Sequence, residues 1–239
     1  MTEQASGERG DNVWQTERMG RTWVVIPMFN EGTVISDVIA EVRRTFPHVV
    51  CVDDGSSDSS VESARSAGAI VVEHPINLGQ GAALQTGFDF ALADPEMTEV
   101  VTFDADGQHQ VADAVGMVDK LRCESLDAVI GSRFLDDRTK VSKAKRAVLR
   151  TAAWYTRVTT GMALTDAHNG LRVLSRTVLE NVRVTQNRMA HASELVDLIG
   201  GLKISWAEYP THIVYTEYSK AKGQSLLNSV NILVELIFR

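Results

Sequence analysis

The sequence has few cysteines, no excess of positive charge and no long apolar run. Cys51 and Cys123 are its only cysteines and lie far apart, so we expect neither a disulfide framework nor a cysteine-based metal cluster, and a reducing compartment is favoured. A formal net charge of −7 argues against general nucleic-acid binding. No apolar stretch reaches the roughly 18 residues of a membrane-spanning helix.

The beginning of the chain lacks the apolar core of a secretory signal peptide. Residues 1–12 are polar and rich in Gly and Glu, and we expect residues 1–20 to form a disordered tail. The chain as a whole is 44% hydrophobic over 239 residues, which is enough for a substantial core. Length and composition leave open whether that core belongs to one large α/β domain or to two small ones.

After this tail, short apolar runs alternate with stretches of helical periodicity. The runs predict strands at 22–26, 49–52, 70–72, the start of 100–109, and 127–130. The stretches between them predict helices within 34–46, 57–67, 82–93 and 111–121. This alternation predicts an α/β fold with a mostly parallel sheet.

A few local predictions complete the secondary structure. Pro27 is expected to stop the first strand, because proline lacks the N–H that a strand donates. Residues 189–194 are expected on a helix, where His191 and Glu194 share one face. Residues 203–209 and 212–215 alternate enough to predict two more strands.

Two carboxylates follow the fourth predicted strand. Asp104 and Asp106 are separated by one small residue, so both can present oxygens to one hard divalent cation. Phosphate oxygens of a substrate would complete the coordination shell of that cation. Open α/β sheets bind ligands at this position, beyond the carboxyl ends of their strands. The alternative is an ordinary turn, since Asp and Gly favour turns.

Polar residues also follow the other predicted strands, and together they predict one cleft. Taken singly, each is ordinary loop chemistry, with Asp54 as a turn or cap residue and Gly79 as a residue that tolerates an unusual backbone angle. The cleft would collect Asn30, Glu31, Asp54, Gly79, Asp104, Asp106 and Arg133.

Five segments in this order resemble the family 2 glycosyltransferases, and within them the dolichol- or polyprenyl-phosphate sugar transferases. They are Pro27–Glu31, Asp53–Asp58, Asn77–Ala82, Asp104–His109 and Gly131–Arg133, and the resemblance covers roughly residues 22–225. It implies a GT-A fold: a Rossmann-like, mostly parallel central sheet flanked by helices, with a small C-terminal β/helix extension. We therefore expect a single domain over 21–225 and an apolar helix over 226–239.

The resemblance also implies a set of site residues. Mg²⁺ or Mn²⁺ would lie on Asp104 and Asp106 with Gln108 nearby, and the catalytic residues would be Asp106, Arg133 and Glu194. Gln80 departs from the basic residue that many relatives carry, and His109 is expected to be a polar loop residue. A nucleotide-diphosphate sugar, UDP- or GDP-linked, would be held by Pro27, Phe29, Asn30, Glu31, Asp54, Gly79 and Asp104.

These residue types suit the chemistry. A cation held by Asp106 would neutralise charge on a leaving diphosphate. Asp54 is suited to accept a hydrogen bond from a base N–H, and Arg133 to clamp a phosphate with two parallel hydrogen bonds. Asp166 and Arg172 are either a structural pair or substrate contacts.

Basic residues gather between 133 and 157 in this otherwise acidic chain. They form either a solvated helix face or a lip for a phosphorylated acceptor or anionic lipid headgroups. Arg146 and Arg150 are candidate acceptor ligands, and Lys220 and Lys222 resemble a basic loop that closes over the diphosphate in the family. The helix over 226–239 would pack on the core, on a membrane protein, on a second subunit as a homodimer, or on the bilayer.

The resemblance, together with these residues, implies an inverting, metal-dependent glycosyltransferase, which we expect at the cytoplasmic face of the membrane. It would transfer a hexose to a lipid phosphate acceptor of the polyprenyl type. The alternatives are transfer to a glycan hydroxyl, with Glu194 or Asp197 as the base, and a non-catalytic module that binds nucleotide sugars for a membrane protein. A dinucleotide-dependent dehydrogenase is set aside, because Pro27–Gly32 stands where its glycine-rich turn would be.

Overall fold

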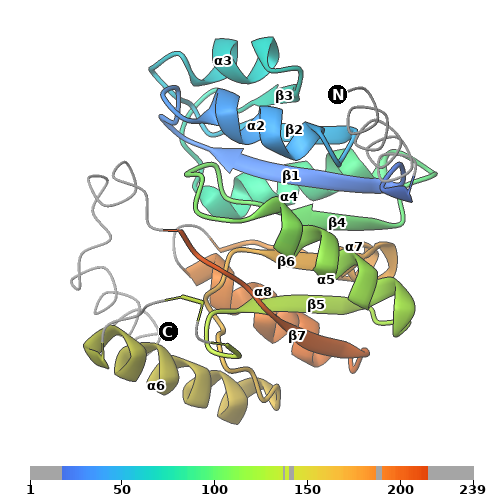
Figure 1. Ribbon diagram of the computed structural model, residues 1–239, viewed down its shortest axis with the longest axis vertical. Helices are drawn as coiled ribbons and strands as arrows, with labels where there is room; N and C mark the ends of the chain where they lie inside the picture. Colours follow the sequence, from blue (N-terminus) through green and yellow to red (C-terminus); the bar gives the residue numbers. More distant parts are fainter. Residues whose placement is uncertain (1–17, 137, 140–142, 187–189, 215–239) are drawn as a thin grey trace, which may run out of the picture.

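The computed structural model describes residues 18–136, 138–139, 143–186 and 190–214 (Figure 1). Its strands are β1 Thr22–Met28, β2 His48–Asp53, β3 Ile70–Glu73, β4 Glu99–Thr102, β5 Ala128–Ser132, β6 Arg172–Ser175 and β7 Trp206–Pro210. Its helices are α2 Ile35–Arg43, α3 Ser60–Ser66, α4 Gln80–Leu92, α5 Val111–Cys123, α6 Lys143–Thr160, α7 Arg176–Asn181 and α8 Ala190–Gly201.

The strands form one seven-stranded sheet in the order β3-β2-β1-β4-β6-β5-β7. The pairs β1–β2, β1–β4, β2–β3 and β5–β7 are parallel, and β6 runs antiparallel to both of its neighbours. The predicted α/β fold with a mostly parallel sheet is therefore confirmed. The C-terminal elements belong to the same sheet, because β6 and β7 flank β5.

Helices cover both faces of the sheet. Alternate residues of each strand point to opposite faces, so Val24 packs with α2, α3 and α5, while its neighbour Val25 packs with α4, α7 and α8. Figure 1 shows α5 crossing in front of the lower strands and α8 behind them. The apolar periodicity of the sequence thus produces two cores, one on each side of the sheet.

Pro27 does not stop the first strand. It pairs with Val52 inside β1, and β4 accompanies β1 only as far as Val25, opposite Thr102. Strand residues alternate the side to which their backbone groups point, and the carbonyl of Val25 accepts from Phe103 on the β4 side. Pro27 therefore turns its missing N–H toward that side, beyond the last β4 pair.

Two strand predictions are corrected. Strand β6 was missed because only Val173 and Leu174 form its buried apolar part, too short a run to stand out. Residues 212–214 are not a strand: their N–H groups bind Asp113, Thr139 and the carbonyl of Gln108 instead of a neighbouring strand.

Some predictions fall outside the described residues. The tail over 1–20 lies there except for residues 18–20, and the predicted helix over 226–239 lies there entirely. The boundaries 21 and 225 stay predictions. In the part of the chain that is described, none of the helices combines the length and the apolar character needed to cross a bilayer.

Candidate active site

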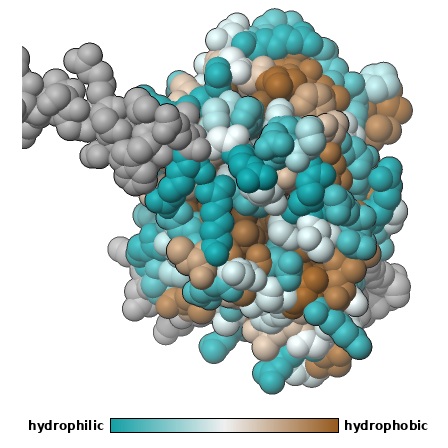
Figure 2. All heavy atoms as spheres, turned by 90° about the vertical axis from the view of Figure 1, so that its right-hand side faces the viewer, coloured by the Kyte–Doolittle hydropathy of each residue, from teal (hydrophilic) through white to brown (hydrophobic). Residues whose placement is uncertain are grey.

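The sheet brings most of the predicted site residues to one edge. Strands β1, β2, β4 and β5 run in the same direction, so the loops that follow them meet at their carboxyl ends, on the left of Figure 1. Figure 2 looks onto the opposite edge, where hydrophilic and hydrophobic residues intermingle.

Asp104 and Asp106 follow β4 and each is held by a side chain of the same loop. Nε2 of His109 lies 2.8 Å from Oδ2 of Asp104, and the side-chain amide of Gln108 donates to Oδ2 of Asp106 at 2.6 Å. The side chain of Gln80, at the start of α4, reaches Oδ1 of Asp104 at 3.5 Å. The loop therefore holds two carboxylates side by side, each oriented by a neighbouring side chain.

The two carboxylates differ in their charge environment. Burial and the nearby charge of Asp104 raise the pKa of Asp106 to about 6, and Glu31 adds to that rise. Burial also opposes ionisation of Asp104, but the charge and the hydrogen bond of His109 keep its pKa below the usual value. Negative charge is thus concentrated at this loop, and Asp106 is the carboxyl at which it is least compensated.

This donor set fits a divalent cation that substrate oxygens help to bind. Two adjacent carboxylates supply hard oxygen ligands, and the raised pKa of Asp106 means that a positive charge at this point would be favourable. Within the described residues, no group of three or more His, Cys, Asp or Glu side chains is arranged to hold a metal ion. Such a pair alone would leave most of the metal shell to a diphosphate.

The structure refines two predictions about this loop. Gln108 is expected near the metal, and its side-chain amide group is directed at Asp106, so it orients that carboxylate. His109 is expected to be a polar loop residue, yet it is only 5% exposed and bonded to Asp104. The ring of His109 also packs edge-on against Phe103.

The loop after β1 is tied to the loop after β2. The backbone N–H of Asn30 donates to Ser56, and the side chain of Asn30 accepts from the N–H of Ser57. The N–H of Glu31 donates to the buried hydroxyl of Ser60 at 2.8 Å. Asn30 and Glu31 are therefore brought together with the second loop, while Phe29 is 42% exposed beside them.

Asp54 is the anchor of the loop that leads into α4. Its two oxygens accept from the N–H groups of Leu78 at 2.8 Å and Gly79 at 2.7 Å, and Nδ1 of His74 lies 2.9 Å away. Gly79 has φ = 96°, a region that favours glycine. Oδ1 carries the contacts with Leu78 and His74 and Oδ2 only that with Gly79, so the predicted hydrogen bond from a nucleotide base would fall on Oδ2.

Arg133 is held by Asp166 in a bidentate ion pair. Its Nε and one terminal nitrogen donate to the two carboxylate oxygens at 2.5 and 2.6 Å, and Asp166 is fully buried. Burial opposes ionisation of Asp166, but Arg133 keeps its pKa below the usual value. Glu208 of β7 in turn accepts from the N–H and the hydroxyl of Thr165. The predicted phosphate clamp is thus bonded to a carboxylate.

The suggested pair of Asp166 with Arg172 is not a hydrogen-bonded pair, since Asp166 bonds Arg133. Arg172 is 2% exposed and donates to the carbonyls of Ala167 and Ala192. Burial lowers its pKa to about 10, against the opposing charges of Asp104 and Asp166. Arg172 is a buried cation between the acid pair and the Arg133 pair.

Glu194 of α8 bonds a neighbouring loop. Its carboxylate accepts from the N–H and the hydroxyl of Thr185 and from the N–H of Gln186. That loop lies against α4, since a Cβ added to Gly81 would meet the carbonyl oxygen of Gln186 at 2.0 Å. Glu194 is 7% exposed, and its hydrogen bonds tie α8 to the loop beside the start of α4.

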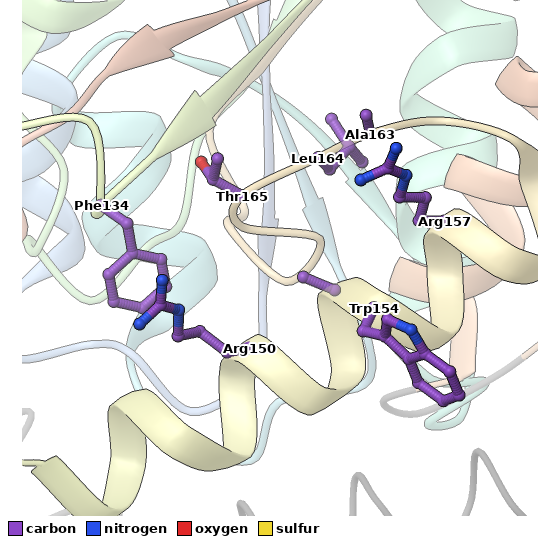
Figure 3. Close-up of a pocket in the computed structure, with 8 residues that line it drawn as sticks. Phe134, Arg150, Trp154, Arg157, Ala163, Leu164 and Thr165 are labelled. Carbon is purple, nitrogen blue, oxygen red and sulfur yellow. The ribbon is translucent and has the colours of Figure 1, made fainter.

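A pocket of about 360 Å³ lies beside the Arg133 pair, between α6 and residues 163–165. Figure 3 shows Arg150 and Arg157 rising from α6 toward Phe134 and Leu164, while Trp154 points away from them. Arg146 also lies on α6, but its side chain is outside the described part, as are Lys220 and Lys222. Of the predicted acceptor ligands, Arg150 is the one placed at a pocket.

Sequence reasoning missed several residues of the site. His74 and Glu208 hold the loops that carry Gly79 and Asp166, and no local pattern reveals a partner so far along the chain. Trp154 could have been found, since it lies four residues after Arg150 and three before Arg157, on one side of a helix.

The chain is similar to proteins of one family. The sequence profile of glycosyl transferase family 2 matches residues 23–183. The UDP-N-acetylglucosamine–dolichyl-phosphate N-acetylglucosaminyltransferase of Methanococcus voltae is 27% identical over 90% of this chain and 94% of that protein. The polyprenol monophosphomannose synthase of Mycolicibacterium smegmatis is 32% identical over 75% of this chain and 70% of that protein.

A solved structure shares the fold. The glucosyl-3-phosphoglycerate synthase of Mycobacterium tuberculosis, crystallised with Mn²⁺, UDP-glucose and phosphoglyceric acid, superposes with a TM-score of 0.67. The two chains are 19% identical, and the superposition covers 95% of this chain and 82% of that one.

Proposed function

The chain belongs to glycosyl transferase family 2, and we propose that it transfers a sugar from a nucleotide-diphosphate sugar to a polyprenyl phosphate, with inversion at the anomeric carbon. It is a glycosyltransferase that resembles polyprenyl-phosphate sugar transferases, as the names of the relatives above indicate. This membership sets aside the alternative of a non-catalytic binding module.

One observation carries the choice of acceptor. The pocket on α6 is lined by two arginines and two aromatic side chains, and it adjoins the Arg133 pair through Phe134 and Thr165. Arginines suit a phosphate, and aromatic rings suit an apolar chain. A lipid phosphate combines both chemistries, which a glycan hydroxyl does not.

The donor would lie across the loops after β1, β2 and β4. Asn30 and Glu31 are suited to the nucleoside, with Phe29 beside it, while Asp54 positions Gly79 at the start of α4. Asp104 and Asp106 would hold Mg²⁺ or Mn²⁺, which supplies positive charge to the leaving diphosphate. Gln108 and His109 would keep the two carboxylates oriented.

The reaction would be a single displacement. An oxygen of the acceptor phosphate attacks the anomeric carbon, the bond from that carbon to the diphosphate oxygen breaks on the opposite side, and the nucleoside diphosphate leaves. An acceptor phosphate is already ionised at neutral pH, so no general base is required. The bonded carboxylate of Glu194 is consistent with this route, and it is a weaker candidate for the base that a hydroxyl acceptor needs.

Two assays test the proposal. Nucleotide sugars should raise the melting temperature in the presence of Mn²⁺ or Mg²⁺. At a hundred times its dissociation constant, a ligand should add about 2.7 kcal/mol to the apparent free energy of unfolding. Radiolabelled sugar should then move to a polyprenyl phosphate and not to glycan hydroxyls. Transfer only to hydroxyl acceptors would contradict the proposed acceptor, and an absent thermal shift with every donor would contradict the proposed site.

We also propose a location for the enzyme, the inner face of the cell membrane, because that is where a cytoplasmic nucleotide sugar meets a lipid phosphate. Residues 226–239 would add an attachment, to the bilayer, to a membrane protein or to a second copy of this chain. Fractionation of cells expressing the full chain, with a salt wash of the membranes, tests this location.

A further inference from the structure

Helix α6 presents four residues on one side, which we call the outer face: Arg150, Trp154, Arg157 and Val158. Their spacing of four, seven and eight residues from Arg150 places them within an arc of about 100° around the helix axis. The two arginines lie at the pocket end of this arc, and Trp154 points away from them (Figure 3). The side of α6 next to the two arginines is buried, with Leu149 and Ala153 packed into the protein and α6 packed against α8. The helix is therefore anchored on one side, and its outer face is exposed.

The apolar part of the outer face is unusually exposed. Trp154 is 64% and Val158 is 65% exposed, and these are the highest values among the large hydrophobic residues that the structure describes. Tryptophan usually buries its ring and directs its N–H to a polar partner, an arrangement that a membrane interface also provides. Trp154 and Val158 lie one helical turn apart, and together they indicate a surface that is covered by another apolar partner.

Within the part of the chain that the structure describes, no carboxylate neutralises the charged part of the outer face. Among the described residues, neither Arg150 nor Arg157 has a carboxylate partner. Arginines elsewhere on the surface are paired, such as Arg65 with Glu73 and Arg183 with Asp89. A protein with a net charge of −7 thus keeps positive charge beside its exposed tryptophan.

We propose that the outer face docks on an anionic bilayer, with Trp154 and Val158 in the interface and Arg150 and Arg157 at the level of the lipid phosphates. Exposed apolar residues flanked by arginines are the composition of helices that lie in a membrane surface. Each arginine near an anionic surface contributes favourably, and the attraction falls off within about 10 Å. The inference rests on the proposed function, since an enzyme that uses a lipid acceptor must reach it in a membrane.

This docking would bring the pocket to the acceptor. Arg150, Trp154 and Arg157 belong both to the outer face and to the lining of the pocket (Figure 3). A lipid phosphate at headgroup level would therefore meet the pocket without leaving the interface. The bilayer is the occupant that matches both the charge and the apolar residues of this surface.

Flotation of the full chain with vesicles tests the proposal without donor or acceptor. We expect binding to phosphatidylcholine vesicles that contain phosphatidylglycerol, and weak binding to phosphatidylcholine alone. Arg157→Glu replaces a positive by a negative charge and should weaken binding about 30-fold. Val158→Ser, which changes no residue of the pocket, should weaken it about fivefold.

Matched controls separate the outer face from general surface effects. Arg183→Glu reverses the charge of another exposed arginine, and Ile70→Ser removes an exposed apolar side chain of β3. Both should bind anionic vesicles as the unchanged chain does. The emission of Trp154, taken as the difference from Trp154→Phe, should shift to shorter wavelength with anionic vesicles only.

The outcomes are distinct. The proposal is overturned if Arg157→Glu and Val158→Ser bind vesicles like the unchanged chain, if the Trp154 emission does not shift, or if no vesicle binds at all. Transfer to a short, water-soluble polyprenyl phosphate tests the proposed function separately. Val158→Ser should retain that transfer, so a loss of docking alone would leave the proposed function in place.

Discussion

Asp54 and Asp106 follow two strands of the same sheet, but the structure treats them differently. Asp54 is 4% exposed, and its oxygens accept two backbone N–H groups and contact His74. Asp106 accepts from the backbone and the side chain of Gln108, and burial beside Asp104 raises its pKa to about 6. The protein itself supplies hydrogen bonds to both oxygens of Asp54, whereas the charge of Asp106 calls for a cation from outside the chain.

The two carboxylates differ in whether they stabilise the folded protein or are suited to bind a ligand. A carboxylate that accepts from backbone N–H groups stabilises the fold, and its loss leaves those donors without partners. A carboxylate held near others of the same sign destabilises the fold until a cation binds. Replacing the two residues should therefore have opposite effects on stability.

The largest effect on activity is expected from Asp106→Asn. The variant keeps the shape of the side chain but loses the charge that would hold the metal, so transfer should fall about 10²–10³-fold. Its melting temperature should not fall, because a carboxyl with a raised pKa lowers stability at neutral pH. Calorimetric unfolding and a transfer assay measure both, and a clearly less stable variant would show that Asp106 is structural.

The second effect is a loss of stability in Asp54→Ala. The N–H groups of Leu78 and Gly79 would lose their acceptor, and we expect a loss of about 2–4 kcal/mol in the free energy of unfolding. Urea denaturation measures it, with Glu41→Ala on the exposed side of α2 as the control. Unchanged stability with lost nucleotide binding would instead favour a direct contact of Asp54 with the base.

A third, smaller effect is a pH dependence of Mn²⁺ binding. The pKa of Asp106 is raised to about 6, so the carboxyl is ionised above that pH and protonated below it. The metal competes with this proton, and its affinity should fall about fivefold between pH 6 and pH 5 and about tenfold between pH 7 and pH 5. Stability without metal changes in the opposite direction. The contribution of Asp106 to the free energy of unfolding is greatest below its usual pKa of 3.8 and is lost as the pH rises through 6.

Titration calorimetry of the metal at pH 7, 6 and 5 measures this dependence. Asp106→Asn is the control and should show weak binding at every pH. An affinity that does not change between pH 7 and pH 5 would mean that Asp106 does not bind the metal.

The smallest effect is expected from Glu194→Gln. The amide oxygen can still accept from Thr185 or Gln186, and an ionised acceptor needs no base, so transfer should stay within about twofold. Glu194→Ala should lose about 2 kcal/mol of stability because those donors lose their partner. If Glu194→Gln instead slowed turnover by about two orders of magnitude, that result would support a base and hence a hydroxyl acceptor.

The sequence predicted the parts of the fold that depend on local pattern. Buried strands such as β2 and amphipathic helices such as α2 follow from the spacing of their apolar residues, and Asp104 and Asp106 follow from their place after a strand. The direction of β6 could not be predicted, because a short strand pairs by tertiary contact and not by pattern.

The partners of the charged residues were also beyond the sequence. Arg133 and Asp166 are 33 residues apart, and other carboxylates, such as Asp136, lie much nearer to Arg133 along the chain. Helical or strand periodicity says which side of an element a residue lies on, but not which element faces it. The interpretation of Asp54, Glu194 and His109 changed for this reason, although their positions near the site did not.

The place of β6 has a consequence for the order in which the protein folds. It lies between β4 and β5 in the sheet but follows both in the sequence. A nascent chain that ends before Arg172 can pair the four strands β1, β2, β3 and β4, and the loops after these strands carry Asp54 and the acid pair. Strand β5 is then still separate, because β6 is the strand that connects it to β4. The exposed edge of β4 in such an intermediate would invite association with other chains. Assembly of the half that carries Arg133 therefore waits for residues 172–175, while the strands that carry Asp54 and the acid pair can form first.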